Sequence, residues 1–195
     1  AYKIRGAYYK ISTLSDEEKA RGLVTASAGN HAQGVAYAAQ AAGVSATIVM
    51  PTTTPLVKVN NTKDYGAKVV LHGETFDDAA ELAAEVGADG VHVGQQDMSP
   101  RQARAILGPN GIVGVSAHTV EEARAAQAEG ADYLGVGAVF VTGTKENTTP
   151  VDYETLKEIC AAVDIPVVAI GGVGRNNLSS LAGSGIQGVA VVSAL

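Results

Sequence analysis

The chain has few of the residues that build disulfide-bonded or aromatic-rich proteins. Its 195 residues include one cysteine, two phenylalanines, seven tyrosines and no tryptophan. A single cysteine excludes both a disulfide within the chain and a metal cluster held by cysteines. Glycine, by contrast, is abundant, with 23 residues. Abundant glycine with few aromatics is typical of repeated strand–helix units that are joined by tight turns.

Clusters of positive charge and long apolar runs are also missing. Lysine and arginine number 14 against 20 acidic residues, a formal net charge of −6, and no basic run exceeds two residues. This balance argues against nucleic acid and against a membrane surface as partners. No apolar stretch reaches the roughly 18–20 residues of a membrane span. We therefore expect a cytoplasmic protein, and the composition suits a reducing cytosol.

Short runs rich in β-branched residues recur along the chain at a nearly constant period. They begin at residues 23, 46, 68, 89, 112, 133, 166 and 188, so all gaps but one are 21–23 residues. This gap accommodates one strand, a short loop and a helix of three turns. Most runs are continuously apolar, as expected of parallel strands that are covered on both faces. The runs are 23–26, 46–50, 68–72, 89–93, 112–116, 133–136, 166–170 and 188–192.

The segments between the runs begin and end with residues that favour helix termini. Residues 30–42 are rich in alanine and stop at Gly43, a favoured residue after a helix. Ser99 followed by proline predicts a helix that begins at that point. Threonine or serine followed three residues later by glutamate predicts a capping box at Thr119 and at Ser15.

These elements predict a single α/β domain of eight parallel strand–helix units. A helical region at 4–21 precedes the first strand, and we expect it to take the place of a helix after the eighth. We therefore predict a TIM-barrel-like (βα)8 fold, because closing the sheet removes two exposed edge strands. The alternative is an open, doubly wound, Rossmann-like sheet, in which the fourth strand crosses to the far side of the first.

The first part of the chain contains four long segments that match one enzyme family. They are residues 2–7 (YKIRGA), 25–34 (TASAGNHAQG), 46–51 (ATIVMP) and 65–73 (YGAKVVLHG). On these segments residues 1–80 resemble the fold-type II pyridoxal-phosphate enzymes, especially threonine deaminase. The resemblance implies that Lys3 is a remnant of the Schiff-base lysine. It also implies that Ser27, Gly29 and Asn30 belong to the loop that holds substrate and pyridoxal phosphate.

From residue 87 onward the chain resembles a different family, thiamin phosphate synthase, a (βα)8 barrel. The matching segments are 87–97 (GADGVHVGQQD), 114–119 (GVSAHT), 135–137 (GVG), 140–145 (FVTGTK), 166–172 (PVVAIGG) and 191–194 (VVSA). The resemblance implies that Asp97 is a magnesium ligand and that Ser116 and Lys145 hold a pyrimidine diphosphate. It further assigns a thiazole phosphate to Thr142, Thr144, Gly172 and Ser193.

The two resemblances meet at residues 81–86, inside an expected helix and without a linker. Natural fusions usually join whole domains through flexible connections, so this junction predicts an engineered chimera, a de novo scaffold built from two fragments. In the second family, the loops after the second and third strands supply cationic side chains and another carboxylate for the metal. Here the first of these loops has Pro51 and three threonines, and the other has His72 and Glu74. We therefore expect no efficient catalysis.

A phosphate site is the feature that we expect to survive in this scaffold. Loops after the seventh and eighth strands of barrels commonly bind phosphate through backbone amides. The expected phosphate-binding residues are Ser116, Thr142, Thr144, Lys145, Gly171, Gly172 and Ser193. Two alternatives stay open: residual magnesium-dependent thiamin phosphate synthase activity, and weak binding of pyridoxal phosphate through Lys3. The expected partners are phosphate or sulfate, and the chain is expected to be a monomer or a dimer.

Overall fold

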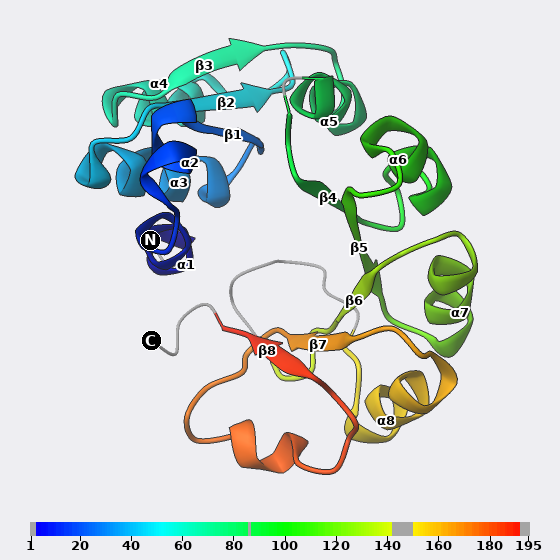
Figure 1. The fold of residues 1–195 in the computed structure, drawn as a ribbon. Coiled ribbons are helices and arrows are strands. Elements are labelled where there is room, and N and C mark those ends of the chain that lie inside the picture. Colours follow the sequence, from blue (N-terminus) through cyan, green and yellow to red (C-terminus); the bar gives the residue numbers. More distant parts are fainter. Residues whose placement is uncertain (1–2, 86, 142–149, 192–195) are drawn as a thin grey trace. The chain divides into compact units, whose positions relative to one another are not determined.

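The computed structural model describes residues 3–85, 87–141 and 150–191. The chain divides into two compact units, Ala1–Ala88 and Asp89–Leu195. Each unit contains a parallel sheet, one with the order β1-β2-β3 and one with the order β4-β5-β6-β7-β8 (Figure 1). The α/β class with parallel strands is therefore confirmed.

In the first unit, helices flank a three-stranded sheet. Every strand pairs in parallel with its neighbour, Thr25 opposite Ile48 and Ile48 opposite Val69. The elements are α1 (Lys3–Ser12), α2 (Asp16–Arg21), β1 (Leu23–Ala26), α3 (Asn30–Ala42), β2 (Ala46–Met50), α4 (Leu56–Asp64), β3 (Lys68–Leu71) and α5 (Phe76–Glu85).

Helices cover both faces of this sheet. Ile48 and Met50 of β2 are fully buried in a cluster with α3 residues such as Ala38. Val49 points to the opposite face, because successive side chains alternate along a strand, and there it packs with Leu82 of α5. Such two-sided cover is typical of doubly wound sheets.

The N-terminal helical region is broken into two helices, where the sequence predicted one region over 4–21. Ser15 forms a capping box with Glu18, which starts α2 as the sequence predicts. α1 packs on α3 through Gly34, where an added Cβ would lie 2.8 Å from the Cβ of Lys3. The expected role of this region as a replacement for the last helix stays a prediction.

In the second unit, a five-stranded parallel sheet carries helices α6, α7 and α8 (Figure 1). The segment between β7 and β8 holds a short 3-10 helix, η1. The elements are β4 (Gly90–Val93), α6 (Pro100–Leu107), β5 (Ile112–Ala117), α7 (Val120–Ala128), β6 (Tyr133–Val136), α8 (Tyr153–Ala162), β7 (Val167–Ile170), η1 (Leu178–Leu181) and β8 (Gly188–Ala190).

The two faces of the five-stranded sheet differ in chemistry. Val113, Val115 and Leu134 are almost fully buried on one face. The register of β4, β5 and β6 places the following residues together on the other face: His92, Gly114, Ser116, Tyr133 and Gly135. One face of the sheet is therefore polar and contains two glycines, and the opposite face is apolar.

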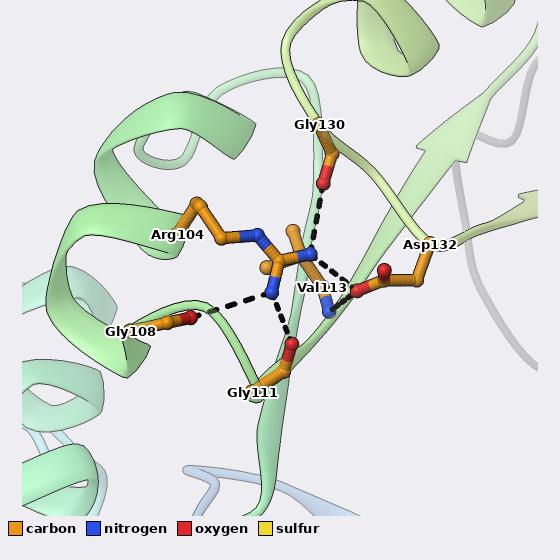
Figure 2. A network of polar contacts seen from close by, with 6 residues as sticks. All are labelled: Arg104, Gly108, Gly111, Val113, Gly130 and Asp132. Carbon is orange, nitrogen blue, oxygen red and sulfur yellow. Dashed lines mark hydrogen bonds and ion pairs between the residues drawn. The ribbon is translucent and has the colours of Figure 1, made fainter.

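Arg104 near the end of α6 ties together the loops at the amino-terminal ends of β5 and β6 (Figure 2). Its guanidinium donates hydrogen bonds to the carbonyl oxygens of Gly108, Gly111 and Gly130. It also forms an ion pair with Asp132. The planar fork of arginine, with five N–H donors, suits this convergence of acceptors.

The helix termini largely follow the sequence prediction, with one difference. Ser99 and Gln102 form a capping box at the start of α6, and Gly43 ends α3 with a left-handed φ of 67°. At α7 the hydroxyl of Thr119 caps Glu122 N–H, as predicted. The Glu122 carboxylate, however, accepts a hydrogen bond from the backbone N–H of His118 at 2.7 Å. In a capping box this bond would come from the backbone N–H of Thr119, so here the donor is one residue earlier in the chain.

The strand pairing differs from the predicted closed barrel. The strands form two separate sheets among the residues that the structure describes, so a single closed sheet is not confirmed. No helix in the described parts of the chain is long and apolar enough to span a membrane.

Candidate functional site

The loop after β4 holds Asp97 in a tight turn. Its carboxylate Oδ2 accepts a hydrogen bond from Gly94 N–H at 2.6 Å, and its own N–H donates to Gly94 O at 3.3 Å. The capping box of Ser99 starts α6 two residues later, which fixes the far side of the turn. An exposed carboxylate is therefore placed at the carboxyl end of β4.

Ser116 lies near the carboxyl end of the neighbouring strand, β5. Its backbone oxygen accepts a hydrogen bond from Gln95 Nε2 at 2.6 Å, and its Oγ lies 2.9 Å from His92 Nε2. The β4 loop and the end of β5 are thus linked by a side-chain contact that spans 21 residues of sequence. Gln95 and His92 place Ser116 beside the Asp97 loop.

Gly171 and Gly172 form the turn after β7, with positive φ values of 97° and 63°. A Cβ added at Gly172 would lie 2.6 Å from the carbonyl oxygen of Val141, so only glycine fits against that loop. The Asn177 side chain closes the turn, donating to Gly172 O at 2.9 Å and accepting from Gly174 N–H at 2.7 Å.

These three features share one edge of one sheet. β4, β5 and β7 belong to the same parallel sheet, so the loops after their carboxyl ends lie along the same side. A carboxylate, a hydroxyl and a glycine turn along one sheet edge suit a phosphorylated ligand with a divalent cation. No cluster of three or more metal-ligating side chains occurs in the described segments.

Four predicted phosphate-binding residues lie outside the residues that the structure describes. They are Thr142, Thr144, Lys145 and Ser193.

A hollow of about 380 Å³ lies between the β4–α6 loop and α7. Gln95, Asp97 and Val115 line one part of it. Glu122 of α7 and Glu129, which caps the C-terminus of that helix, line another part. Val115 points to the face opposite Ser116, because neighbouring residues of a strand alternate. Three carboxylates around one hollow disfavour an anionic ligand, so we do not assign phosphate to it.

The residues predicted from the first resemblance lie in the first unit. Ser27 follows β1, and its Oγ accepts a hydrogen bond from Gly29 N–H at 3.3 Å. Asn30 is the first residue of α3, and Lys3 packs where α1 meets Gly34, one turn further along that helix. The structure therefore brings Lys3 close to the start of α3.

Comparison with known proteins identifies the family. The family described as thiamine monophosphate synthase matches residues 59–195, more than half of the chain. The chain belongs to the thiamine monophosphate synthase family. The match runs through the predicted junction at 81–86 and includes Asp97, Ser116, Gly171 and Gly172.

Curated relatives and one solved structure agree with this family. A thiamine-phosphate synthase from Ruminiclostridium cellulolyticum is 51% identical over 134 residues, covering 69% of this chain and 61% of the relative. One from Methanobrevibacter smithii is 47% identical over 134 residues, covering 69% and 62%. A thiamine phosphate pyrophosphorylase structure from Pyrococcus furiosus has a TM-score of 0.54 at 32% identity, covering 91% and 88%. The chain spans about three fifths of the length of the curated relatives that it matches.

The prediction of an engineered chimera is wrong. The match to the thiamine monophosphate synthase family begins at residue 59, inside the part that we assigned to threonine deaminase, and continues without interruption across the predicted junction. The structure from Pyrococcus furiosus aligns with 91% of the chain. Short motif matches in residues 1–80 therefore misled the assignment of that segment.

The prediction of a scaffold without efficient catalysis is contradicted by the same comparisons. The relatives in this family are named thiamine-phosphate synthase. They support the alternative that we left open, and pyridoxal phosphate as a cofactor is not supported. Lys3, Ser27, Gly29 and Asn30 lie before the matched range, which begins at residue 59.

Sequence reasoning missed the side chains that hold Ser116 in place. Gln95 and His92 occur in the quoted segment 87–97, but no role was assigned to them. A signal was present, since His92 and Ser116 each lie between apolar residues, and Gly114 and Gly135 lie on the same face as Tyr133. The contacts between these residues depend on the register of three strands, which cannot be derived from the sequence alone.

Proposed function

We propose that this protein is a thiamine phosphate synthase, which joins a pyrimidine diphosphate to a thiazole phosphate and releases diphosphate. The observation that carries the proposal is the placement of Asp97, Ser116 and the Gly171-Gly172 turn after strands of one parallel sheet. The names of the relatives support the same reaction. Because the chain spans only about three fifths of those relatives, the complete activity is part of the proposal.

Each part of the site has a role in this proposal. The Ser116 hydroxyl binds the pyrimidine diphosphate together with Lys145. The Gly171-Gly172 turn binds the phosphate of the thiazole substrate through backbone N–H groups, helped by Thr142, Thr144 and Ser193. Backbone amides at a turn suit this role, because they present fixed partial positive charges to a phosphate. Two phosphorylated substrates would thus meet at one sheet edge.

The donor groups fit magnesium that arrives with the diphosphate. Mg²⁺ is usually bound by one or two carboxylates together with waters and substrate phosphates. Asp97 is exposed and supplies one carboxylate, and the Ser116 hydroxyl lies on the adjacent strand. When bound, the ion would offset the negative charge that builds up on the departing diphosphate. Asp97 would hold it, and Ser116 would orient the diphosphate.

The finer architecture belongs to this proposal as well. We propose that the two parallel sheets are parts of one (βα)8 barrel, supported by the likeness to the thiamine phosphate pyrophosphorylase from Pyrococcus furiosus. Free phosphate or sulfate is expected to occupy the Gly171-Gly172 turn. Whether the chain is a monomer or a dimer stays a prediction.

The test is product formation by the full chain with both substrates, with and without Mg²⁺. Asp97→Asn should lower the rate by about 10²-fold or more if the carboxylate helps to stabilise charge in the transition state. Asp89→Asn is the matched control, because this exposed aspartate precedes β4 at its opposite end. The control should keep the wild-type rate. No thiamine phosphate above a heat-treated sample, or equal rates for both variants, would overturn the proposal.

A further inference from the structure

Two aromatic rings lie over glycines on the face of the sheet that carries Ser116. A Cβ added at Gly114 of β5 would lie 2.3 Å from Cζ of Tyr133, so the tyrosine ring from β6 crosses this glycine. A Cβ at Gly135 would lie 3.2 Å from Cε1 of His92. The ring centroids of His92 and Tyr133 are 5.4 Å apart, tilted by 41°. The two glycines thus leave room for both rings.

The rings connect three strands through a chain of hydrogen bonds. Tyr133 OH lies 2.9 Å from His92 Nδ1, and His92 Nε2 lies 2.9 Å from Ser116 Oγ. A neutral imidazole has one N–H donor and one acceptor nitrogen, so these two contacts have opposite polarity. The direction of one therefore sets the direction of the other.

The surroundings of Tyr133 decide this direction. Burial raises the pKa of the Tyr133 hydroxyl above its ordinary value, which keeps its proton in place at neutral pH. His92 Nδ1 is the only acceptor found for this hydroxyl among the residues that the structure describes. A partly buried hydroxyl without an acceptor costs free energy, so Tyr133 donates to Nδ1. The imidazole proton is then on Nε2, which donates to Ser116 Oγ.

This arrangement prepares Ser116 to bind an anion. Its oxygen already accepts a hydrogen bond from His92, so its own O–H is available to donate to a ligand. In the opposite tautomer, Ser116 would donate to His92 and would present only lone pairs, which repel a phosphoryl oxygen. The difference between the two tautomers is therefore a difference in affinity for phosphorylated ligands.

We propose that Tyr133 and His92 are positioning residues that hold Ser116 as a hydrogen-bond donor to the diphosphate. They do so by keeping His92 in the Nε2–H tautomer. This inference rests on the proposed function, in which Ser116 binds the diphosphate of the pyrimidine substrate.

The test combines nitrogen NMR of the histidine rings with binding of inorganic diphosphate in the presence of Mg²⁺. In protein labelled with ¹⁵N-histidine, His92 should show a protonated Nε2 and an unprotonated Nδ1. Tyr133→Phe keeps the ring over Gly114 but removes the hydroxyl. It should shift His92 toward a mixture of tautomers, weaken diphosphate binding by about tenfold, and raise KM more than it changes kcat.

Tyr153→Phe is the matched control, because it removes a tyrosine hydroxyl that donates to Ala182 O at 2.9 Å elsewhere in the same unit. It should leave the His92 spectrum and the dissociation constant unchanged. An Nδ1–H tautomer in the wild-type protein would overturn the inference, as would a Tyr133→Phe variant with an unchanged spectrum and affinity. A wild-type protein with the Nε2–H tautomer that binds no diphosphate would instead overturn the proposed function.

Discussion

Arg104 Nη2 lies 2.5 Å from Asp132 Oδ2 at the amino-terminal edge of the five-stranded sheet. The same carboxylate oxygen accepts a hydrogen bond from Val113 N–H at 2.7 Å (Figure 2). One ion pair thus joins the end of α6, the start of β5 and the segment before β6. It lies at the edge of the sheet opposite the candidate site, so we expect it to contribute to stability and not to the chemistry.

Arg104→Ala should destabilise the second unit without altering the chemistry. An exposed ion pair alone contributes about 0.2–1 kcal/mol, but Arg104 also satisfies three backbone carbonyls. We expect a loss of about 1–2 kcal/mol and a fall in Tm of roughly 2–8 °C in thermal unfolding. Arg101→Ala is the control, since Arg101 is exposed on the same helix. Equal Tm values for both variants would contradict the structural role of Arg104.

Asp132 should also make stability depend on pH. Partial burial raises the pKa of Asp132, but the Val113 N–H and the Arg104 guanidinium lower it more, so the net pKa lies below the ordinary value of 3.8. A lowered pKa stabilises the folded state above pH 3.8, and this contribution is lost as the pH falls through the pKa of the folded protein.

Denaturant unfolding of wild type and Asp132→Asn at several pH values measures this contribution. The difference in the free energy of unfolding should be present near pH 6 and should shrink as the pH falls below the ordinary aspartate pKa of 3.8. Because the Asp132 side chain is 46% exposed, we expect a contribution of less than about 1 kcal/mol. A difference that stays constant down to acid pH would show that the Asp132 charge is not involved.

The sequence predicted local structure better than it predicted how the strands pair. Ser15, Ser99 and Gly43 mark helix ends through contacts within a few residues, and all three do so in the structure. The strands follow from short apolar runs for the same reason. Sheet closure, in contrast, depends on pairing between distant segments, and local patterns do not determine it.

Family motifs supplied Asp97, Ser116 and the glycine turn as candidate site residues, and their roles stay predictions. The partners of Ser116 could not be predicted in this way. His92 is 24 residues from Ser116 and 41 residues from Tyr133, and their contacts require the register of three strands. Glu122 shows the same limitation on a small scale, since its carboxylate binds the amide of His118 and not that of its predicted partner.

Gly172→Ala should destabilise the protein more than an alanine at another glycine with the same backbone conformation. Gly172 and Gly43 have φ values of 63° and 67°, but only Gly172 lacks space for a Cβ. The left-handed backbone costs alanine about 1–2 kcal/mol at either position, and the contact with Val141 adds about 1–3 kcal/mol at Gly172. Equal unfolding free energies for the two variants would mean that the loops after β6 and β7 do not pack as described.

Inorganic phosphate should stabilise the protein by binding at the Gly171-Gly172 turn and near Ser116. Binding to the folded state alone adds about 2.7 kcal/mol when the ligand is at one hundred times its Kd, which corresponds to a Tm rise of roughly 5–11 °C. The titration is made at constant ionic strength, so that screening of the net charge of −6 does not change. Gly172→Ala and Ser116→Ala should reduce the dose-dependent rise, whereas Gly43→Ala should lower the starting Tm and keep the rise. The same increase in all four proteins would mean that phosphate acts through general salt effects, and the glycine turn would then have no anion-binding role.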